Sequence, residues 1–474
     1  MEINNIQAVY FIGAGGIGMS CLERYFLSIG KTVGGYDRTP SALTEELQKE
    51  GVLLHFEDDP AQIPAAFRQK GSTLVVFTPA IPENHKELAY FRQAGFEIHK
   101  RAQVLGTITR ASRGLCVAGT HGKTTTSTML AHILHCALPE GCTAFLGGIS
   151  QNYHSNLILP GKSGSPFTVI EADEFDRSFH WLQPDMAVVT ATDPDHLDIY
   201  GTKEAYLESF RHFTSLIRPG GVLLLHEGTE LKPDLQAGTR LYTYARQSGD
   251  FHAEHIQAGG GEITFDLVAP TDVLPGGKLC NISLGVPVSI NIDNGIAAMA
   301  IALLVGADPE KVKEAMASFR GVERRFDFKI RTPQKALLSD YAHHPQELRQ
   351  SLLSLRELYP GKKITALFQP HLYSRTRDFY AEFADALSLA DAVILTEIYP
   401  AREQPIPGVS SQLIYDRLRP GIERALCLKK DLHEQLEHCE TDVLAVLGAG
   451  DLDALLPKIE AHMRKRWGIA PPKP

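Results

Sequence analysis

The chain has 474 residues, which allows three or four domains at roughly 100–200 residues per domain. Hydrophobic residues make up 43% and charged residues 22%, a mixture that excludes a disordered chain and a collagen-like or coiled-coil rod. The formal net charge of −9 argues against a nucleic-acid partner, although a local cluster of cations can still bind an anionic substrate.

The sequence carries no signal for export or membrane insertion. Its first residues lack a charged leader and a cleavable apolar segment, and no apolar run approaches the ~20 residues of a membrane span. The seven cysteines form no CxxC pair, which disfavours a disulfide framework or a structural zinc site. We therefore expect a cytoplasmic protein with no membrane partner.

Residues 1–110 alternate short apolar runs with polar helical stretches. Strands are expected at 8–12 and 74–77, with a helix from Ser41, its N-cap, to Glu50 between them. This βαβ order predicts a parallel sheet.

A glycine turn of the GxGxxG type follows the first strand. It comprises Gly13, Ala14, Gly15, Gly16, Ile17 and Gly18. Asp37 lies near the position of a ribose-binding acid. Such a turn binds a diphosphate at a helix N-terminus, but NAD, FAD and a nucleotide-sugar would all satisfy it. Taken alone the segment favours a dehydrogenase, and a tight turn without a ligand is the simpler alternative.

Residues 111–320 restart the α/β pattern. The expected strands are 115–118, 168–170 and 187–190, and the expected helices are 125–135 and 294–305. Between 228 and 290, short alternating runs at 241–244 and 262–265 suggest antiparallel strands at the edge of the domain.

A shortened phosphate loop joins the first of these strands to its helix. The loop comprises Gly119, Thr120, His121, Gly122, Lys123, Thr124 and Thr125. Backbone N–H groups of such a loop cradle phosphates, Lys123 reaches the β and γ oxygens, and the Thr124 hydroxyl binds Mg²⁺. A lysine and three threonines at a helix start have no packing purpose, so a purely structural reading is poor.

Acidic clusters follow the next two strands. Glu171 ends one apolar strand, where open α/β sheets place their sites. Asp193, Asp195 and His196 follow the other, and an imidazole beside carboxylates can complete the shell of a second cation.

Residues 321–474 form a third α/β series. Its expected strands are 336–339, 364–368, 392–395 and 443–447. Polar loops follow two of them, and they carry the candidate residues Asp340, Tyr341, His343, His371 and Arg375. A lone histidine is usually structural, but histidines in two such loops favour a site.

Together these motifs resemble the Mur ligases, ATP-dependent amide-forming enzymes of peptidoglycan precursor synthesis. The motifs GAGGIGMS, AGTHGKTTT, EADEFDRSF, DPDHLDIY, RRFDF, DYAHHP, FQPHLYSRTRD and LGAGD occur in the family's order from residue 13 to residue 451. The resemblance implies an α/β protein of three domains. These are a Rossmann-like UDP-binding domain at 1–110, a P-loop-type ATPase domain with a mostly parallel sheet at 111–320, and a Rossmann-like amino-acid-binding domain at 321–474.

The resemblance also implies roles for single residues. Lys123 and Thr124 would hold the ATP phosphates and one Mg²⁺ that Glu171 shares, and His196 would bind a second Mg²⁺. Arg325 and Asp340 would contact ATP from the domain boundary. The alanine-adding branch has matches at Tyr341, His343, His371 and Arg375, and the planar fork of an arginine suits a carboxylate. The implied substrates are UDP-N-acetylmuramate, L-alanine and ATP, and the expected state is a monomer or homodimer.

Two stretches depart from the family pattern. The segment that usually reads close to PGxHNxxN keeps Asn291 and Asn294, whose amides can bind adenine, but has Val288 and Ile290 at the glycine and histidine. Several relatives carry a carbamylated lysine at the position that Phe210 occupies in this sequence. The alanine-adding branch also lacks that lysine.

Three alternatives remain open from the sequence. A recycling ligase that attaches a preformed tripeptide to the same UDP-sugar would have similar first and second domains. An NAD-dependent oxidoreductase would use the first glycine turn but leave Lys123, Glu171 and His196 unexplained. A regulatory nucleotide-binding protein without catalysis would not need those side chains intact.

Overall fold

The computed structural model describes residues 3–78, 80–161, 164–194, 197–259, 261–401 and 403–470. It divides into two compact units. The first comprises Met1–Ala253, Leu267–Leu279 and Asn294–Met316, and the second comprises Glu254–Asp266, Cys280–Asp293 and Ala317–Pro474. The boundaries at 110 and 320 remain predictions.

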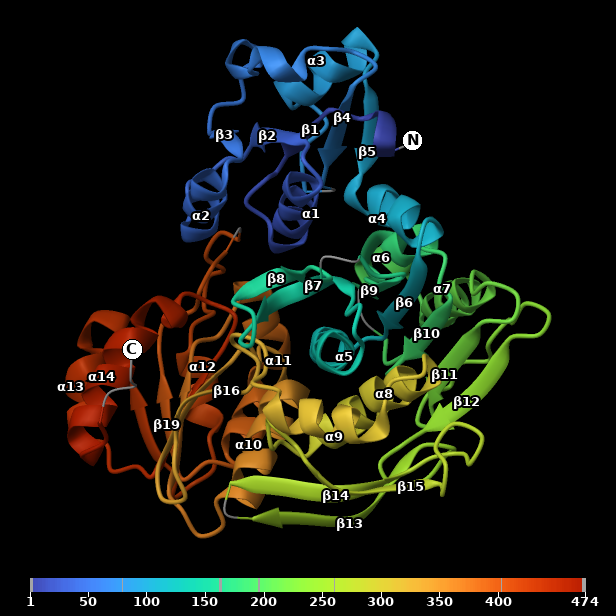
Figure 1. The fold of residues 1–474 in the computed structure, drawn as a ribbon. Coiled ribbons are helices and arrows are strands. Elements are labelled where there is room, and N and C mark those ends of the chain that lie inside the picture. The colour runs from blue at the N-terminus through green and yellow to red at the C-terminus, as the bar shows by residue number, and fades with distance from the viewer. Residues whose placement is uncertain are drawn as a thin grey trace. The chain divides into compact units, whose positions relative to one another are not determined.

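The first sheet has five parallel strands in the order β3-β2-β1-β4-β5 (Figure 1). The strands are β1 (Ala8–Ile12), β2 (Thr32–Tyr36), β3 (Leu53–His55), β4 (Thr73–Phe77) and β5 (Glu97–Lys100), and the helices are α1 (Ile17–Ser28), α2 (Ala42–Glu50), α3 (Lys86–Ala94) and α4 (Arg101–Arg110). The Ser41 side chain accepts from the Thr44 backbone N–H, which confirms it as the N-cap of α2. The predicted Rossmann-like arrangement is present.

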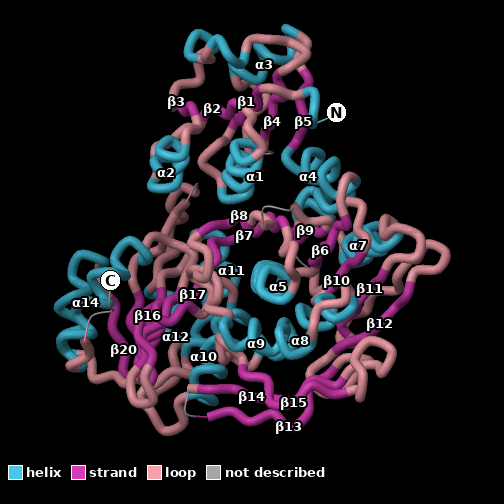
Figure 2. The backbone as a smooth tube through the Cα atoms, in the orientation of Figure 1, coloured by secondary structure: helices cyan, strands magenta, loops and turns pink. Residues whose placement is uncertain are grey.

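The second sheet has seven strands in the order β12-β11-β10-β6-β9-β7-β8. The strands are β6 (Arg113–Ala118), β7 (Thr143–Ser150), β8 (Ser155–Ile158), β9 (Phe167–Glu171), β10 (Met186–Val189), β11 (Val222–His226) and β12 (Arg240–Tyr244), and the helices are α5 (Lys123–Ala137), α6 (Leu197–Tyr200) and α7 (Lys203–Ser215). In both sheets helices alternate with strands along much of the chain (Figure 2).

The prediction of antiparallel pairing at 241–244 was wrong. β12 runs parallel to β11 and forms the edge of the seven-stranded sheet. Its alternating sequence reflects an edge strand that is exposed at its start and buried at its end, and such a pattern carries no information on strand direction. Within this sheet the β7–β8 pair is antiparallel.

A small three-stranded sheet, β13-β14-β15, contains the other run predicted there. Its strands are β13 (His252–Gly259), β14 (Glu262–Val268) and β15 (Lys278–Ser283), and the helices α8 (Ile290–Leu304) and α9 (Pro309–Ser318) follow. β13 and β14 are joined by a connection that only antiparallel strands can bridge, because a parallel crossover needs a dozen residues or more. Helix α8 begins four residues earlier than predicted, so Asn291 and Asn294 lie in its first turns.

The third predicted series forms a six-stranded sheet in the order β16-β17-β21-β18-β19-β20. Its strands are β16 (Asp327–Arg331), β17 (Ala336–Asp340), β18 (Ile364–Phe368), β19 (Ala392–Leu395), β20 (Glu423–Leu426) and β21 (Val443–Leu447), and its helices are α10 (Pro345–Leu358), α11 (Tyr373–Leu387), α12 (Gln412–Arg417), α13 (Leu432–His438) and α14 (Leu456–Trp467). All its pairs are parallel except β16–β17. β17, β21 and β18 are adjacent, which brings the loops after them to one edge.

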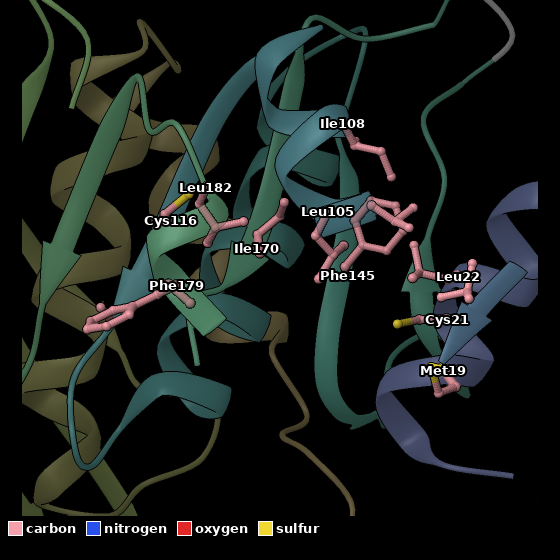
Figure 3. Packing of buried hydrophobic residues seen from close by; sticks show 14 of the residues in the cluster. Met19, Cys21, Leu22, Leu105, Ile108, Cys116, Phe145, Ile170, Phe179 and Leu182 are labelled. Carbon is pink, nitrogen blue, oxygen red and sulfur yellow. The ribbon is translucent and has the colours of Figure 1, made fainter. Parts of the chain in front are cut away.

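One hydrophobic cluster in the first unit fixes α1 and α4 against the second sheet (Figure 3). Met19 and Leu22 of α1, Leu105 of α4, Phe145 of β7 and Ile170 of β9 all belong to it and are almost fully buried. This packing holds the first glycine turn in a defined position relative to the end of β9.

None of the helices in the described ranges is long and apolar enough to cross a bilayer.

Candidate active site

The phosphate loop adopts a backbone conformation that favours glycine. Gly119 has a φ of +136°, and a Cβ there would lie 2.1 Å from the Thr190 hydroxyl oxygen. Gly122 has a φ of +80° and forms the N-cap of α5. Helix α5 therefore starts at Lys123, two residues before the predicted start, and its first N–H groups point to the loop.

Lys123 lies at the centre of the loop and is paired. Its Nζ donates to the Gly119 carbonyl at 2.6 Å and to Glu174 Oε1 at 2.9 Å. Glu174 is almost fully buried, and its burial raises the pKa of the carboxyl while the Lys123 ammonium opposes that rise. Glu174 belongs to the stretch 168–174, which was expected to supply metal-binding carboxylates, but its pairing with Lys123 was not predicted.

Thr124 and Glu171, which were predicted to share one Mg²⁺, are in contact. The Thr124 hydroxyl donates to Glu171 Oε1 at 3.0 Å, and the Gly147 backbone N–H donates to Glu171 Oε2 at 3.0 Å. A hydroxyl and a carboxylate in contact are hard oxygen donors, which is the chemistry that Mg²⁺ requires. His196, predicted for a second Mg²⁺, lies outside the described residues.

The remaining loop threonines and the asparagines of α8 are also held. Thr120 donates to the Asp193 carbonyl at 2.7 Å, and the buried Asn294 accepts from the Thr126 hydroxyl at 3.1 Å. In the second unit, the Asn291 amide donates to the Val286 carbonyl at 3.2 Å. Phe210 is fully buried and edge-on to Phe179, so its position is packed with aromatic rings rather than open to a modified lysine.

The first glycine turn lines a cleft of about 320 Å³. Gly13, Gly16, Ile17 and Gly18 form one side, and Arg101, Gly147, Glu171 and Asp173 are also among its lining residues. Asp37 lies behind the turn, where its Oδ2 accepts from the Gly15 N–H at 2.7 Å. One cleft therefore joins the first glycine turn to the carboxylate beside the phosphate loop.

Arg101 supplies a cation to this cleft that sequence reasoning missed. Its guanidinium lies against Gly18, where a Cβ would be 2.4 Å from Nη1, and Nη2 is 3.5 Å from Asp173 Oδ2. The sequence feature that could have indicated Arg101 is its position directly after the short strand β5. Residues at the carboxyl ends of parallel strands often line a binding site.

In the second unit, Asp340 ends β17 and is held by its neighbours. It accepts from the Phe326 N–H at 3.3 Å and from the Ser351 hydroxyl. Burial raises the pKa of Asp340, while Ser351 and Arg325 act in the opposite direction. The Arg325 guanidinium lies over the Tyr341 ring, 5.2 Å from its centroid.

The four residues predicted for the amino acid gather in the same unit. The rings of His343 and His371 are 6.2 Å apart. Burial lowers the pKa of both imidazoles, and the Arg375 charge acts in the same direction, while Glu347 opposes the shift at His343. The pKa of His371 falls to about 4 and that of His343 falls below its usual value, so both imidazoles are mainly neutral at pH 7. The buried Nη1 of Arg375 and the buried Nδ1 of His371 have no hydrogen-bond partner among the described residues.

The unpaired guanidinium N–H of Arg375 offers a donor that a small anion can accept from. A buried guanidinium N–H without a partner is costly, and a carboxylate would satisfy it. Neutral imidazoles next to it can contact or accept a proton from an amine, as an amino acid requires.

Comparisons with known proteins identify the family of the chain. Three family models match: the Mur ligase family, catalytic domain, at residues 8–113, the Mur ligase middle domain at 117–302, and the Mur ligase, glutamate ligase domain, at 324–452.

Relatives and solved structures extend the match over the whole chain. A UDP-N-acetylmuramate–L-alanine ligase of Phocaeicola vulgatus is 63% identical over 466 residues, 98% of this chain and 100% of the relative. The enzyme of the same name from Flavobacterium johnsoniae is 44% identical over 98% of this chain and 100% of its own. The crystal structure of a UDP-N-acetylmuramate-alanine ligase from Thermotoga maritima has a TM-score of 0.79 at 28% identity and covers 97% of this chain and 99% of its own. This chain belongs to the Mur ligase family.

Proposed function

We propose that this chain joins L-alanine to the lactyl carboxylate of UDP-N-acetylmuramate with hydrolysis of ATP to ADP and phosphate, in the synthesis of peptidoglycan precursors. The cleft of the first unit is the observation that carries this proposal. It connects a diphosphate-binding glycine turn with Glu171, which contacts Thr124 of the phosphate loop. A UDP-sugar bound at the turn could therefore bring its acid to the γ-phosphoryl group.

The first step is phosphoryl transfer. A carboxylate oxygen of the sugar acid attacks the γ-phosphorus, the bond to the β-phosphate oxygen breaks, and an acyl phosphate and ADP form. Lys123 would leave Glu174 and bind the phosphates, and the N–H groups at the start of α5 would hold them. Thr124 and Glu171, with His196, are the residues that would hold Mg²⁺, which when bound neutralises phosphate charge.

The second step is amide formation. The neutral amine of L-alanine attacks the acyl carbon, a tetrahedral intermediate forms, and phosphate leaves as the amine loses a proton. Arg375 would pair with the alanine carboxylate, and His343 and His371 are neutral and could receive that proton. Asp340 and Arg325 are also proposed to contact ATP.

The test is phosphate release from ATP with UDP-N-acetylmuramate and a series of amines. We expect L-alanine to give the highest kcat/KM, glycine and L-serine lower values, and a murein tripeptide no turnover. Faster turnover with the tripeptide would instead identify the recycling ligase. Absence of phosphate release together with NAD reduction would favour the oxidoreductase.

A further inference from the structure

Three side chains of metal-ligand type gather on two outer helices of the second unit. His433 and Glu437 are one turn apart on α13, and His462 lies on α14. One ligand atom from each lies within 4.8 Å of those from the other two. None of the three belongs to the predicted sites, and none is a cysteine, so the cysteine spacing gave no sign of the cluster.

His462 is the least exposed of the three and has an unmet bonding requirement. Its side chain is nine-tenths buried, and its buried Nε2 has no hydrogen-bond partner in the described part of the chain. Its Nδ1 is 3.6 Å from Glu437 Oε1, and its ring is edge-on to His433 with the centroids 4.6 Å apart. An imidazole nitrogen buried without a partner costs free energy that a bound cation would recover.

The two helices are fixed by a shared core. Leu432 and Leu436 of α13 and Ile459 and Met463 of α14 belong to one hydrophobic cluster that also includes Leu444 of β21. Ligands of a tetrahedral site are about 3.4 Å apart when metal–nitrogen bonds are about 2.1 Å long. Because His433 and Glu437 are exposed, side-chain rotations that bring the ligand atoms closer by up to about 1.4 Å would reach that spacing.

The local charges suit a metal ligand. Burial lowers the pKa of His462, with His433, Arg466 and Lys465 acting in the same direction and Glu437 opposing them. The imidazole is therefore neutral at neutral pH, which is the form that binds metal. The Arg466 guanidinium is turned to the Leu436 carbonyl, and the Glu437 carboxylate supplies the negative charge.

Two imidazoles and one carboxylate select a borderline divalent ion over Mg²⁺ or Ca²⁺, which prefer all-oxygen shells. We propose that His433, Glu437 and His462 bind Zn²⁺, with water as the fourth ligand, and that the ion links α13 to α14. The three ligands lie on α13 and α14, whereas the amino-acid cluster lies on the loops after β17 and β18 and at the start of α11.

The test is Zn²⁺ titration of the full chain by calorimetry, after removal of metals with EDTA and in excess Mg²⁺ to fill oxygen-ligand sites. The exposed ligands His433→Ala and Glu437→Gln are changed first, because the more buried His462→Ala can also disturb packing. His438→Ala is the matched control, since His438 is an exposed histidine on the same helix outside the cluster.

We expect one Zn²⁺ site that weakens by at least about tenfold in His433→Ala and in Glu437→Gln and is unchanged in His438→Ala. Zn²⁺ should also raise the Tm of the wild type and of His438→Ala, but not of the two ligand variants. A wild-type chain without this site, or equal Zn²⁺ affinity in all four proteins, would overturn the proposal.

Discussion

The phosphate loop and the amino-acid cluster lie at the carboxyl ends of parallel strands, but they differ in how their cations are satisfied. Lys123 donates to a carbonyl and to the buried Glu174, whereas the buried Nη1 of Arg375 has no hydrogen-bond partner among the described residues. A phosphate at the loop would have to displace Glu174 from Lys123, whereas a carboxylate at the cluster would meet an Arg375 Nη1 that no described residue pairs with. From this difference we expect a ligand to overcome an internal competitor at the first site but not at the second.

The largest effect is expected from removing the loop cation. Lys123→Ala should lower kcat for phosphate release by at least about 10³-fold, because no other side chain of the loop can neutralise the phosphates. Lys203→Ala is the matched control, since Lys203 is paired with the exposed Glu230. Steady-state kinetics with thermal unfolding of each variant separate activity from folding. Retained activity in Lys123→Ala would contradict the assignment of the loop.

The next effect concerns the unpaired guanidinium. Arg375→Ala should raise the KM for L-alanine by roughly 10- to 100-fold and leave the KM for ATP unchanged, because a charge-assisted pair is lost at one substrate only. Arg377→Ala, two residues along α11, removes an exposed arginine that pairs with Asp378. Kinetics with each substrate varied in turn measure both constants. Equal rises in the two KM values for Arg375→Ala would refute the role of Arg375.

A smaller effect is expected from changing Glu174, the carboxylate that pairs with Lys123. Glu174→Gln keeps the shape of the side chain but removes the charge that holds Lys123, so the KM for ATP should fall about fivefold. Glu230→Gln, at an exposed pair, should leave it unchanged. If the KM for ATP rises in Glu174→Gln, the carboxylate assists nucleotide binding, and the contrast between the two sites is wrong.

Sequence patterns predicted the strands well where both faces of a sheet are covered. The runs at 8–12 and 364–368 are buried throughout, and continuous apolar stretches indicated them. The edge strand β12 was assigned the wrong direction, because alternation reports which face is exposed and not which neighbour pairs. The motifs also indicated that Thr124 and Glu171 lie close together, because strand ends of a parallel sheet meet at one edge. The two side chains are hydrogen-bonded in the structure.

Contacts between side chains that are distant in the sequence could not be predicted from sequence patterns. Glu174 lies in a quoted motif, yet its contact with Lys123 depends on the turn after β9. Arg101 enters the cleft only because α4 packs with α1 in one core. His433 and His462 are 29 positions apart and come together through helix packing.

The smallest effect tests the neutral state of the cluster through stability. The pKa of His371 is about 4 in the folded chain against about 6.5 when unfolded, so between these values the unfolded state binds more protons. The free energy of unfolding should therefore fall as the pH falls from about 6.5 to 4. In His371→Asn the free energy of unfolding should fall less over this range. The difference from the wild type should be below about 2 kcal/mol, because the His371 side chain is partly exposed. Urea unfolding across this pH range, followed by Trp467 emission in a Trp181→Phe background, reports on the second unit. An identical pH dependence with and without His371 would show that the imidazole is not held neutral, and the amino-acid cluster would then resemble the charged loop.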